Sequence, residues 1–574
     1  MYPDNTRGKP DMVDNFLMIV LRRRFEAIIR DMVNALFKSG RSGVLNTAMD
    51  FSCSITDAKF QSISAAIGLP VHTGAIDLIP RVVAERYGDK IAKGDCFANN
   101  DGYLGNTHCA DFTLCVPVFF GGRIRFYAIA RAHFADMGFP TPTTYGADAF
   151  DRYQEGLQLP CVRIQNDYED VSEVVDICRA NIRAPEQFYG DYKACLAAVR
   201  TGEMRIEEMC EKYGADLIEE FVEEFQSYAE RMAVTAIAKL PAGKVEGTYF
   251  YETDLPEYPE GIPVHAEIDV DPANGKIRID LTRNVDNVPL GINMTESTTL
   301  ASCRMATLNV LGSEIPRCSG AFRCIEVTMR EGAVIGKPKM PAATCAATSN
   351  LCSAFASHLH ALYAKLQPGL GSAYGTVGVP ASASVISGRD PRYGDKEYVN
   401  QILMGYWGGP ATGKSDGWLT CGSASTQGAI SQSSVEVSEL QHPIIVEKLS
   451  IRQDSSGAGQ FQGSPGATIS FYANKASVRF IFYSGSREIP PRGVRGGKNA
   501  APTMAWLERQ DGTRELLPNN GNILLQPGER LHSESCGGGG YGDPSLRDPE
   551  RVKHDLREGW ISQEFAEQHY GLNR

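Results

Sequence analysis

The sequence predicts an α+β fold in which helices dominate the first part of the chain and strands the second. Apolar residues recur three and four positions apart over residues 14–39, the pattern of an amphipathic helix. Apolar runs flank the pairs Gly121-Gly122 and Asn274-Gly275, the pattern of two β-hairpins. We therefore expect a mixed N-terminal domain with a helical extension, a β-rich domain with helical inserts, and a C-terminal docking helix.

The chain begins with its clearest helix. Residues 14–39 carry the apolar stripe, and Gly40 is a suitable stop. Residues 46–60 then alternate around Asp50 and Asp57, which predicts two short strands.

More helices follow before the β-rich part. Residues 68–88 turn into a second helix near Ala75. Residues 170–182 and 186–240 interleave charged and apolar side chains and are predicted to be largely helical. We expect this helical stretch to be interrupted at three glycines: Gly190, Gly202 and Gly214.

From residue 245 the pattern changes to that of strands. The hairpin at Asn274-Gly275 is followed by further alternating runs, interrupted by helical inserts near residues 298–311 and 349–366. Residues 548–570 are helical and charged but too few for a domain, so we expect them to dock on the body or on a neighbour. The expected domains are 1–243, 244–545 and 546–574.

Composition limits the class of protein. A chain of 574 residues with 43% hydrophobic and 22% charged residues is long enough for several folded domains and is not disordered. No apolar run is long enough to span a bilayer, and a net charge of −12 disfavours nucleic acid. The 15 cysteines contain no Cys-x-x-Cys pair, which favours free thiols in a reducing compartment. We expect a cytoplasmic protein with no membrane segment.

A candidate site lies at the open end of the first hairpin. The runs 113–120 and 123–132 fold back at Gly121-Gly122, which brings the region of His108 and Asp111 near His133 and Asp136. A regular register would pair Asp111 with Ala132, and a one-residue offset puts Asp111 and His133 on opposite faces. Pro117 marks an edge strand or a bulge, and a bulge would supply the one-residue shift.

Two imidazoles and a carboxylate on rigid strand ends suit a divalent metal such as Zn, Mn or Fe, with positions left open for substrate. The alternative is that both histidines make ordinary hydrogen bonds, since His-x-x-Asp is a weak pattern. Spacing alone leaves both interpretations open.

Other motifs have simpler interpretations. Residues 408–415 match the phosphate-loop expression G-x-x-x-x-G-K-[ST], but a glycine- and serine-rich stretch follows where an amphipathic helix is required. The glycine run 537–540 predicts a turn or close backbone packing, and residues 454–466 predict tight turns. Cys109 is either a thiolate nucleophile or ligand, or, as we favour, an incidental buried thiol.

Taken together, several strings resemble the hydantoinase B/oxoprolinase family, whose members include hydantoinase, oxoprolinase and caprolactamase subunits and subunits of ketone carboxylases. They occur in order over almost the whole chain: RSGVLNTAMDFSC, GLPVHTGAI, GDCFANNDGYLGNTHCADF, RAHFADMG, YQEGLQLP, NIRAPEQFYGD, DSSGAGQFQGSPG and GGGGYGDP. The match is specific to the superfamily and says much less about substrate.

The resemblance implies a metal site and a partner. The family's ligand pattern falls on His108, Asp111 and His133, with Asp50 joining them, and the implied ion is Mn or Zn, with Fe an alternative. Asp50 or Asp136 would act as ligand, general base or orienter of an imidazole. A hydantoinase A-type partner would bind ATP and Mg and phosphorylate a carbonyl-derived oxygen in a hetero-oligomer.

One departure from the family pattern bears on the substrate. Many relatives read His-His-Ala-Asp-Ile-Gly-Gly where this chain has phenylalanine at positions 134 and 139. The change predicts a more apolar pocket, with Phe134 and Phe139 near the site, and it leaves a metal-free site possible.

Three functions are compatible with these expectations. In the first, which we favour by a small margin, the chain completes hydrolysis of a phosphorylated hydantoin, lactam or oxoproline. In the second, it belongs to an ATP-dependent ketone carboxylase, which the apolar pocket mildly suits. In the third, it is a non-catalytic scaffold, against which the joint presence of His108, Asp111, His133 and Asp50 argues.

Overall fold

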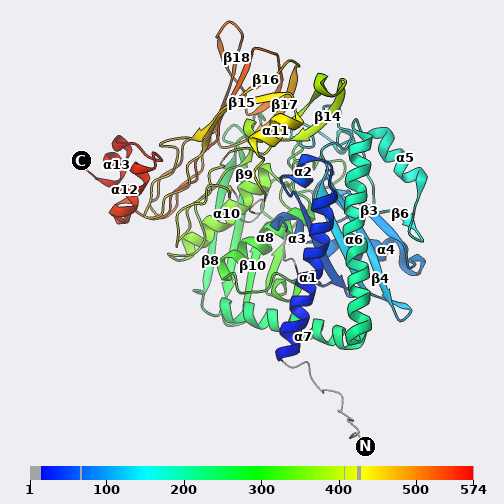
Figure 1. Cartoon of the computed structure of the whole chain (residues 1–574). Coiled ribbons are helices and arrows are strands. Elements are labelled where there is room, and N and C mark those ends of the chain that lie inside the picture. The colour runs from blue at the N-terminus through cyan, green and yellow to red at the C-terminus, as the bar shows by residue number, and fades with distance from the viewer. Residues whose placement is uncertain (1–14, 65–67, 406, 423–427, 429, 573–574) are drawn as a thin grey trace, which may run out of the picture.

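The computed structural model describes residues 15–64, 68–405, 407–422, 428 and 430–572 (Figure 1). Its N-terminal half is built on an antiparallel sheet of seven strands in the order β2-β1-β5-β4-β3-β6-β7. Their bounds are β1 Phe51–Asp57, β2 Ser62–Ser64, β3 Cys96–Asn99, β4 Asp111–Phe120, β5 Arg123–His133, β6 Val162–Asn166 and β7 Glu169–Asp170. The two strands predicted around Asp50 and Asp57 are a single strand, β1, which Asp50 precedes and Asp57 ends.

Helices cover both faces of this sheet. Helices α1 and α6 pack on each other and on one face, while α4 packs on the other (Figure 1). The helices of this half are α1 Asn15–Ser39, α2 Gly43–Asn46, α3 Pro70–Thr73, α4 Leu78–Tyr87, α5 Ser172–Asn181, α6 Pro185–Tyr213 and α7 Ala215–Ile237. The helix predicted at 14–39 and the largely helical region at 170–240 are confirmed.

Two of the three glycines expected to interrupt the helices do not. Gly190 and Gly202 lie inside α6, and only Gly214, with φ 84°, separates α6 from α7. A Cβ on Gly202 would come within 2.8 Å of Met32 Sδ and 2.9 Å of Ala128 Cβ. Glycine is therefore required at position 202 because α1 and the sheet approach α6 closely. It does not interrupt the helix.

The hairpin register contains the one-residue shift that the site requires. Asp111 pairs with His133, and the register changes between Val118 and Phe119, where Arg125 is the extra residue of β5. The bulge therefore lies beside the turn rather than at Pro117, which pairs regularly with Tyr127. Both turn glycines have positive φ, 63° and 80°. The predicted bulge is confirmed, and it places Asp111 and His133 directly opposite each other.

The C-terminal half contains three smaller sheets. Their strand orders are β11-β10-β9-β8; β12-β17-β13-β14, with β20 on β17; and β15-β16-β21-β18-β19. The bounds are β8 Gly243–Tyr251, β9 Ile262–Asp271, β10 Lys276–Asp280, β11 Ile325–Thr328, β12 Gly378–Val379, β13 Val385–Asp390, β14 Lys396–Gln401, β15 Ile444–Ile451, β16 Ala467–Ala473, β17 Val478–Ser484, β18 Met504–Glu508, β19 Arg514–Leu516, β20 Asn520–Leu525 and β21 Arg530–Glu534. The second and third sheets share one hydrophobic core.

The predicted helical inserts are present, and the single helix predicted at the C-terminus is divided into two. The helices of this half are α8 Glu296–Leu311, α9 Ser319–Phe322, α10 Asn350–Leu366, α11 Val435–Gln441, α12 Pro549–Arg557 and α13 Gln563–Tyr570. The last two dock on the body through Tyr570, which donates to Gln462 Oε1 at 2.5 Å, and through the Asp454 carboxylate, which accepts the Ser562 N–H at 2.6 Å. No helix in the described part of the chain is long and apolar enough to cross a membrane.

The largest hydrophobic core joins the two halves. It runs from Leu21 to Tyr483 and includes residues on both sides of the expected boundary at 243/244. The N-terminal sheet and the first C-terminal sheet, with its covering helix α10, therefore bury side chains in one continuous cluster, and the site lies within the same body.

Candidate metal centre

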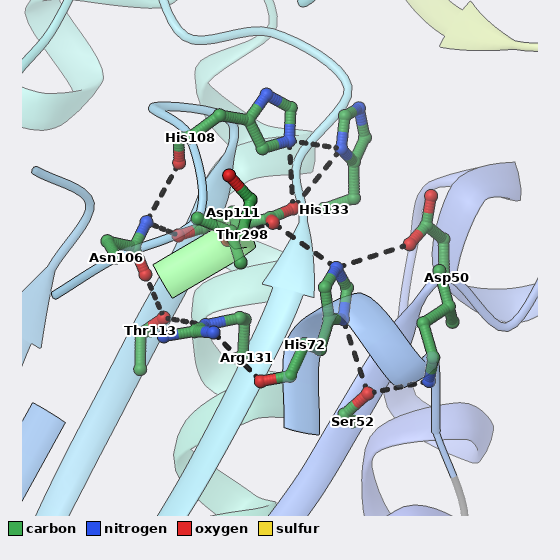
Figure 2. Close-up of polar contacts among 12 residues, drawn as sticks. Asp50, Ser52, His72, Asn106, His108, Asp111, Thr113, Arg131, His133 and Thr298 are labelled. Carbon is green, nitrogen blue, oxygen red and sulfur yellow. Dashed lines mark hydrogen bonds and ion pairs between the residues drawn. The ribbon is translucent and has the colours of Figure 1, made fainter. Parts of the chain in front are cut away.

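Three side chains at the open end of the hairpin form a cluster. Ligand atoms of His108, Asp111 and His133 all lie within 4.8 Å of one another. Asp111 Oδ1 is 3.0 Å from His108 Nε2 and 3.4 Å from His133 Nδ1, and the two nitrogens are 3.2 Å apart (Figure 2). The structure thus brings together the three residues that the hairpin pattern singled out.

A third imidazole, His72, joins the cluster and was missed from the sequence. It lies on the four-residue helix α3, and its Nε2 is 3.2 Å from Asp111 Oδ2 and 3.8 Å from Asp50 Oδ1. The string GLPVHTG contains it, but one histidine in a short turn-like stretch carries no ligand spacing. Only the packing of α3 against β1 and α8 puts it beside Asp111.

Asp50 lies at the edge of the cluster. Its backbone carbonyl accepts the N–H of His133 at 3.0 Å, which ties the start of β1 to the end of β5. Its carboxylate faces His72 (Figure 2). Burial raises the pKa of Asp50, and the imidazoles of His133 and His72 oppose that rise.

The pKa of Asp111, the central carboxylate, is shifted in the opposite direction. Burial works against the charged form of Asp111, but the imidazoles of His108 and His72 outweigh it and hold the pKa of Asp111 well below its usual range. For His108, burial favours the neutral ring, but the Asp111 carboxylate outweighs it and raises the pKa of His108. The cluster therefore keeps Asp111 ionised.

Each imidazole is anchored through the nitrogen that points away from the cluster. His108 Nδ1 donates to the Cys345 carbonyl oxygen at 2.7 Å. His133 Nε2 is 2.9 Å from Thr144 Oγ1, and His72 Nδ1 is 3.2 Å from Ser52 Oγ. Such outer hydrogen bonds fix ring orientation at metal sites and leave the other nitrogen free to bind an ion.

The donor set fits a divalent cation. A carbonyl oxygen can only accept, so His108 Nδ1 carries a proton. His108 Nε2 faces Asp111 Oδ1 and His133 Nδ1. A divalent cation bound among these atoms would displace the proton that the Asp111 carboxylate otherwise favours on Nε2 and would take the lone pair of that nitrogen. Mixed imidazole and carboxylate sets suit Zn, Mn and Fe.

Polar side chains beneath the cluster fix the strands and the loop. Asn106 donates to the backbone oxygens of His108 at 2.8 Å and Asp111 at 2.7 Å. Arg131, which is fully buried, donates to Thr113 Oγ1 at 3.0 Å and to the His72 carbonyl at 2.9 Å (Figure 2). Burial lowers the pKa of Arg131 to about 10. This layer holds α3 against the hairpin.

One glycine permits the approach of α3. Gly68 has φ 145°, and a Cβ there would come within 2.2 Å of Ser52 Oγ. Ser52 Oγ also accepts the N–H of Leu69 at 2.9 Å. A larger residue at position 68 would displace the hydroxyl that anchors His72.

The site is closed to solvent by an aromatic ring. Tyr145 stacks on His133 at 5.1 Å and on His108 at 5.9 Å between ring centroids. His108 and Asp111 are fully buried, and His133 is 2% exposed. Burial raises the pKa of Tyr145 well above its usual range.

Asp136 is not brought into the cluster. Its carboxylate accepts the N–H of Gly138 at 3.0 Å and forms an ion pair with Arg183 at 2.8 Å. An ion pair and two backbone N–H donors already occupy this carboxylate. Asp136 therefore supports the turn after β5, away from the site.

The expectation that Phe134 lines an apolar pocket at the site is wrong. Phe134 follows His133 and points to the opposite face of the sheet, where it stacks on Phe112 at 4.8 Å and meets Phe188 of α6. Phe139 does lie near the site, in a small core with Cys109, which follows His108, and Cys345, whose carbonyl anchors His108. Burial raises the pKa of Cys109 well above its usual value, which fits an inert thiol.

The glycine-containing segments 408–415 and 537–540 have a structural role, as predicted. No helix begins at Lys414, and a Cβ on Gly408 would come within 2.6 Å of the Gly537 backbone. A Cβ at Gly538 would come within 1.9 Å of the Gly409 carbonyl oxygen. These segments approach each other backbone to backbone, which excludes any side chain.

The family model for hydantoinase B/oxoprolinase matches residues 14–544. This chain belongs to the hydantoinase B/oxoprolinase family. The resemblance drawn from the sequence strings is thus confirmed.

Individual relatives match the chain over nearly their whole length. The chain is 28% identical to the beta subunit of the caprolactamase of Pseudomonas jessenii, with 98% of this chain and 96% of the relative covered. It is also 28% identical to the B-type subunit of a putative D-/L-hydantoinase of Pseudomonas sp. (strain NS671), covering 98% and 95%. Both relatives are named as subunits of larger enzymes.

A solved structure agrees with the fold. The crystal structure of the ATP-dependent caprolactamase from Pseudomonas jessenii aligns with a TM-score of 0.88 at 26% identity, covering 98% of this chain and 97% of that chain. The predicted α+β class is confirmed.

Proposed function

We propose that the chain is the metal-bearing catalytic subunit of an ATP-dependent enzyme that hydrolyses a cyclic amide. The observation that carries the proposal is the buried cluster of three imidazoles and the Asp111 carboxylate, with Asp50 beside it. The full-length similarity to the beta subunit of a caprolactamase and to a hydantoinase B-type subunit supports the proposal.

In this proposal His108, Asp111 and His133 hold a divalent cation, with His72 and Asp50 available beside them. A cation bound there supplies Lewis acidity toward a carbonyl or phosphoryl oxygen. Cys345 and Thr144 keep the imidazoles oriented through the hydrogen bonds described above.

Asp50 is the proposed proton acceptor. Its pKa is raised by burial, and a carboxylate with a raised pKa is a better base near neutral pH. His72 Nε2 faces both Asp50 Oδ1 and Asp111 Oδ2 and orients the two carboxylates. The Tyr145 ring excludes bulk water from the imidazoles.

The activating step is assigned to a partner. A hydantoinase A-type subunit that binds ATP and Mg would phosphorylate the amide oxygen, and this chain would complete the ring opening in a hetero-oligomer. The phosphate-loop expression at 408–415 opens no helix, which supports placing ATP on another chain.

The ketone carboxylase is the less supported alternative. Its specific argument was an apolar lining that included Phe134, and this ring instead lies in the core with Phe112. The hydrolase therefore remains the better account of the site.

The test is to purify the chain together with its hydantoinase A-type partner and measure ATP consumption and product formation. Hydantoins, lactams and ketones are offered with and without bicarbonate. Bicarbonate-independent opening of a ring supports the proposal, and activity that requires bicarbonate and a ketone refutes it.

A pair of variants separates catalysis from scaffolding. His108→Ala should abolish both metal content and turnover while the complex still assembles. His532→Ala is the matched control, because His532 is hydrogen-bonded to Ser470 in a different sheet. Full activity of the His108→Ala complex would show that the chain is a scaffold.

A further inference from the structure

A cavity lies next to α3, outside the cluster of His108, Asp111 and His133. It has a volume of about 620 Å³, and Pro70 at the start of α3 and residues 412–416 form part of its lining. Because His72 sits two residues after Pro70, one short helix separates the cavity from the cluster.

Two cations line this cavity without a carboxylate partner. The Arg317 guanidinium donates to Asn309 Oδ1 at 3.0 Å, and within the described ranges no acidic oxygen lies within 4 Å of Arg317 or of the Lys414 ammonium. Unpaired cations that share a cavity attract an anion. The whole chain has a net charge of −12, so this local excess of positive charge is not a general property of its surface.

The acidic residue in the same lining is already neutralised. Asp416 forms ion pairs with Arg547 at 2.8 Å and Arg551 at 2.9 Å, both from the C-terminal segment. These arginines hold the pKa of Asp416 below its usual value despite its burial. Asp416 therefore does not cancel the charge of Lys414 and Arg317.

Hydrogen bonds within the loop fix the conformation of the segment that carries Lys414. Thr412 Oγ1 accepts the backbone N–H groups of Lys414 at 3.1 Å and Ser415 at 3.0 Å, and the Thr412 N–H donates to the Ser415 carbonyl. Because these N–H groups are used inside the loop, they are not available to cradle a phosphate as a phosphate loop does. An anion would be held by the side-chain cations.

The remaining lining is apolar and includes an exposed aromatic ring. Trp418, which is 73% exposed, lines the cavity together with Val310 and Leu370. An indole ring offers a flat surface on which a ligand can pack. Cations together with apolar side chains suit a ligand that has both a charged group and an apolar body.

We propose that this cavity binds a small organic anion, an apolar body that carries a phosphate or carboxylate group. Binding as such needs neither partner nor metal. The further assignment of the anion as the substrate or product of the metal cluster rests on the proposed function.

Calorimetric titration of the full chain tests the binding. The probes are phenyl phosphate, benzoate, inorganic phosphate and phenol. Saturable binding of phenyl phosphate or benzoate, much tighter than that of phenol, is expected. The tighter of the two acids identifies the charged group as phosphate or carboxylate. Phenol binding as tightly as both acids overturns the proposal.

Variants locate the site. Lys414→Gln and Arg317→Gln should each weaken the bound anion about tenfold, the effect of losing one charge-assisted hydrogen bond. Lys396→Gln removes an exposed lysine of β14 and should have no effect. Trp418→Ala should weaken phenyl phosphate or benzoate and leave inorganic phosphate unchanged.

Unchanged anion binding in both Lys414→Gln and Arg317→Gln, with thermal midpoints equal to that of the parent chain, overturns the proposal. These measurements use the chain alone. If no anion binding is found, the proposal of an anion site fails, and the turnover assay of the complex still tests the proposed function independently.

Discussion

Replacing Glu155 by glutamine should remove one defined component of the pH dependence of stability. The carboxyl is 2% exposed, and burial raises its pKa from 4.5 to about 7 although the Thr344 N–H and Arg152 oppose that rise. Thr344 precedes Cys345, whose carbonyl anchors His108, so this buried acid helps to hold the backbone that orients His108.

The sign and size follow from proton linkage. Between pH 4.5 and about 7 the folded chain holds a proton on Glu155 that the unfolded chain has lost, so stability falls as pH rises through this window. At about 1.4 kcal/mol for each pH unit, the carboxyl removes about 3 kcal/mol between the two limits. Glu155→Gln should lose this component and keep the acceptor for Thr344.

The assay is urea unfolding of the metal-free chain at pH 4.5 and pH 8, with parent and variant compared at each pH. The drop in unfolding free energy should be about 3 kcal/mol smaller in the variant. Glu85→Gln, an exposed position on α4, should behave like the parent. The same drop in parent and Glu155→Gln would mean that Glu155 stays ionised in the folded chain, and the reasoning would be refuted.

Three further outcomes are expected. Zinc or manganese at 100 times its dissociation constant should stabilise the chain by about 2.7 kcal/mol, read as a higher thermal midpoint, and His108→Ala should show no response. Thr144→Val removes the hydroxyl at His133 Nε2 and should weaken metal binding by about 10–100-fold; unchanged affinity in competition with a chelator would contradict the anchoring role. Gly202→Ala should destabilise by up to about 2 kcal/mol, because a Cβ there meets Met32 Sδ and Ala128 Cβ and the overpacking outweighs a helix-propensity gain of up to about 1 kcal/mol; stabilisation in urea unfolding would contradict the packing argument.

The elements that were predicted well are those whose signal is local. The periodicity of residues 14–39 and the turn pair Gly121-Gly122 each act within a few residues, and both appear in the structure as predicted. The bulge could be inferred because Asp111 and His133 had to share a face. Its position beside the turn could not be inferred, since nothing local to the hairpin distinguishes Pro117 from Arg125 as the place of the extra residue.

What the sequence did not reveal depends on packing between distant segments. His72 reaches Asp111 because Arg131 holds its backbone carbonyl and Ser52 holds its ring. The contact between Gly202 and α1 is likewise tertiary, so a helix-breaking rule applied to the glycine alone gave an interruption that does not exist. In both cases the partner lies outside any local window.

Charge balance gives the strongest physical reason to expect a cation in the cluster. Asp50 and Asp111 are buried at 4% and 0% exposure, and isolated buried carboxylates cost several kcal/mol each. The nearby cation Arg131 donates to Thr113 and to backbone oxygens, and to neither carboxylate. Protonated imidazoles would neutralise the carboxylates, but each would itself be a buried positive charge. A divalent cation compensates both carboxylates and uses the imidazole lone pairs that already face them.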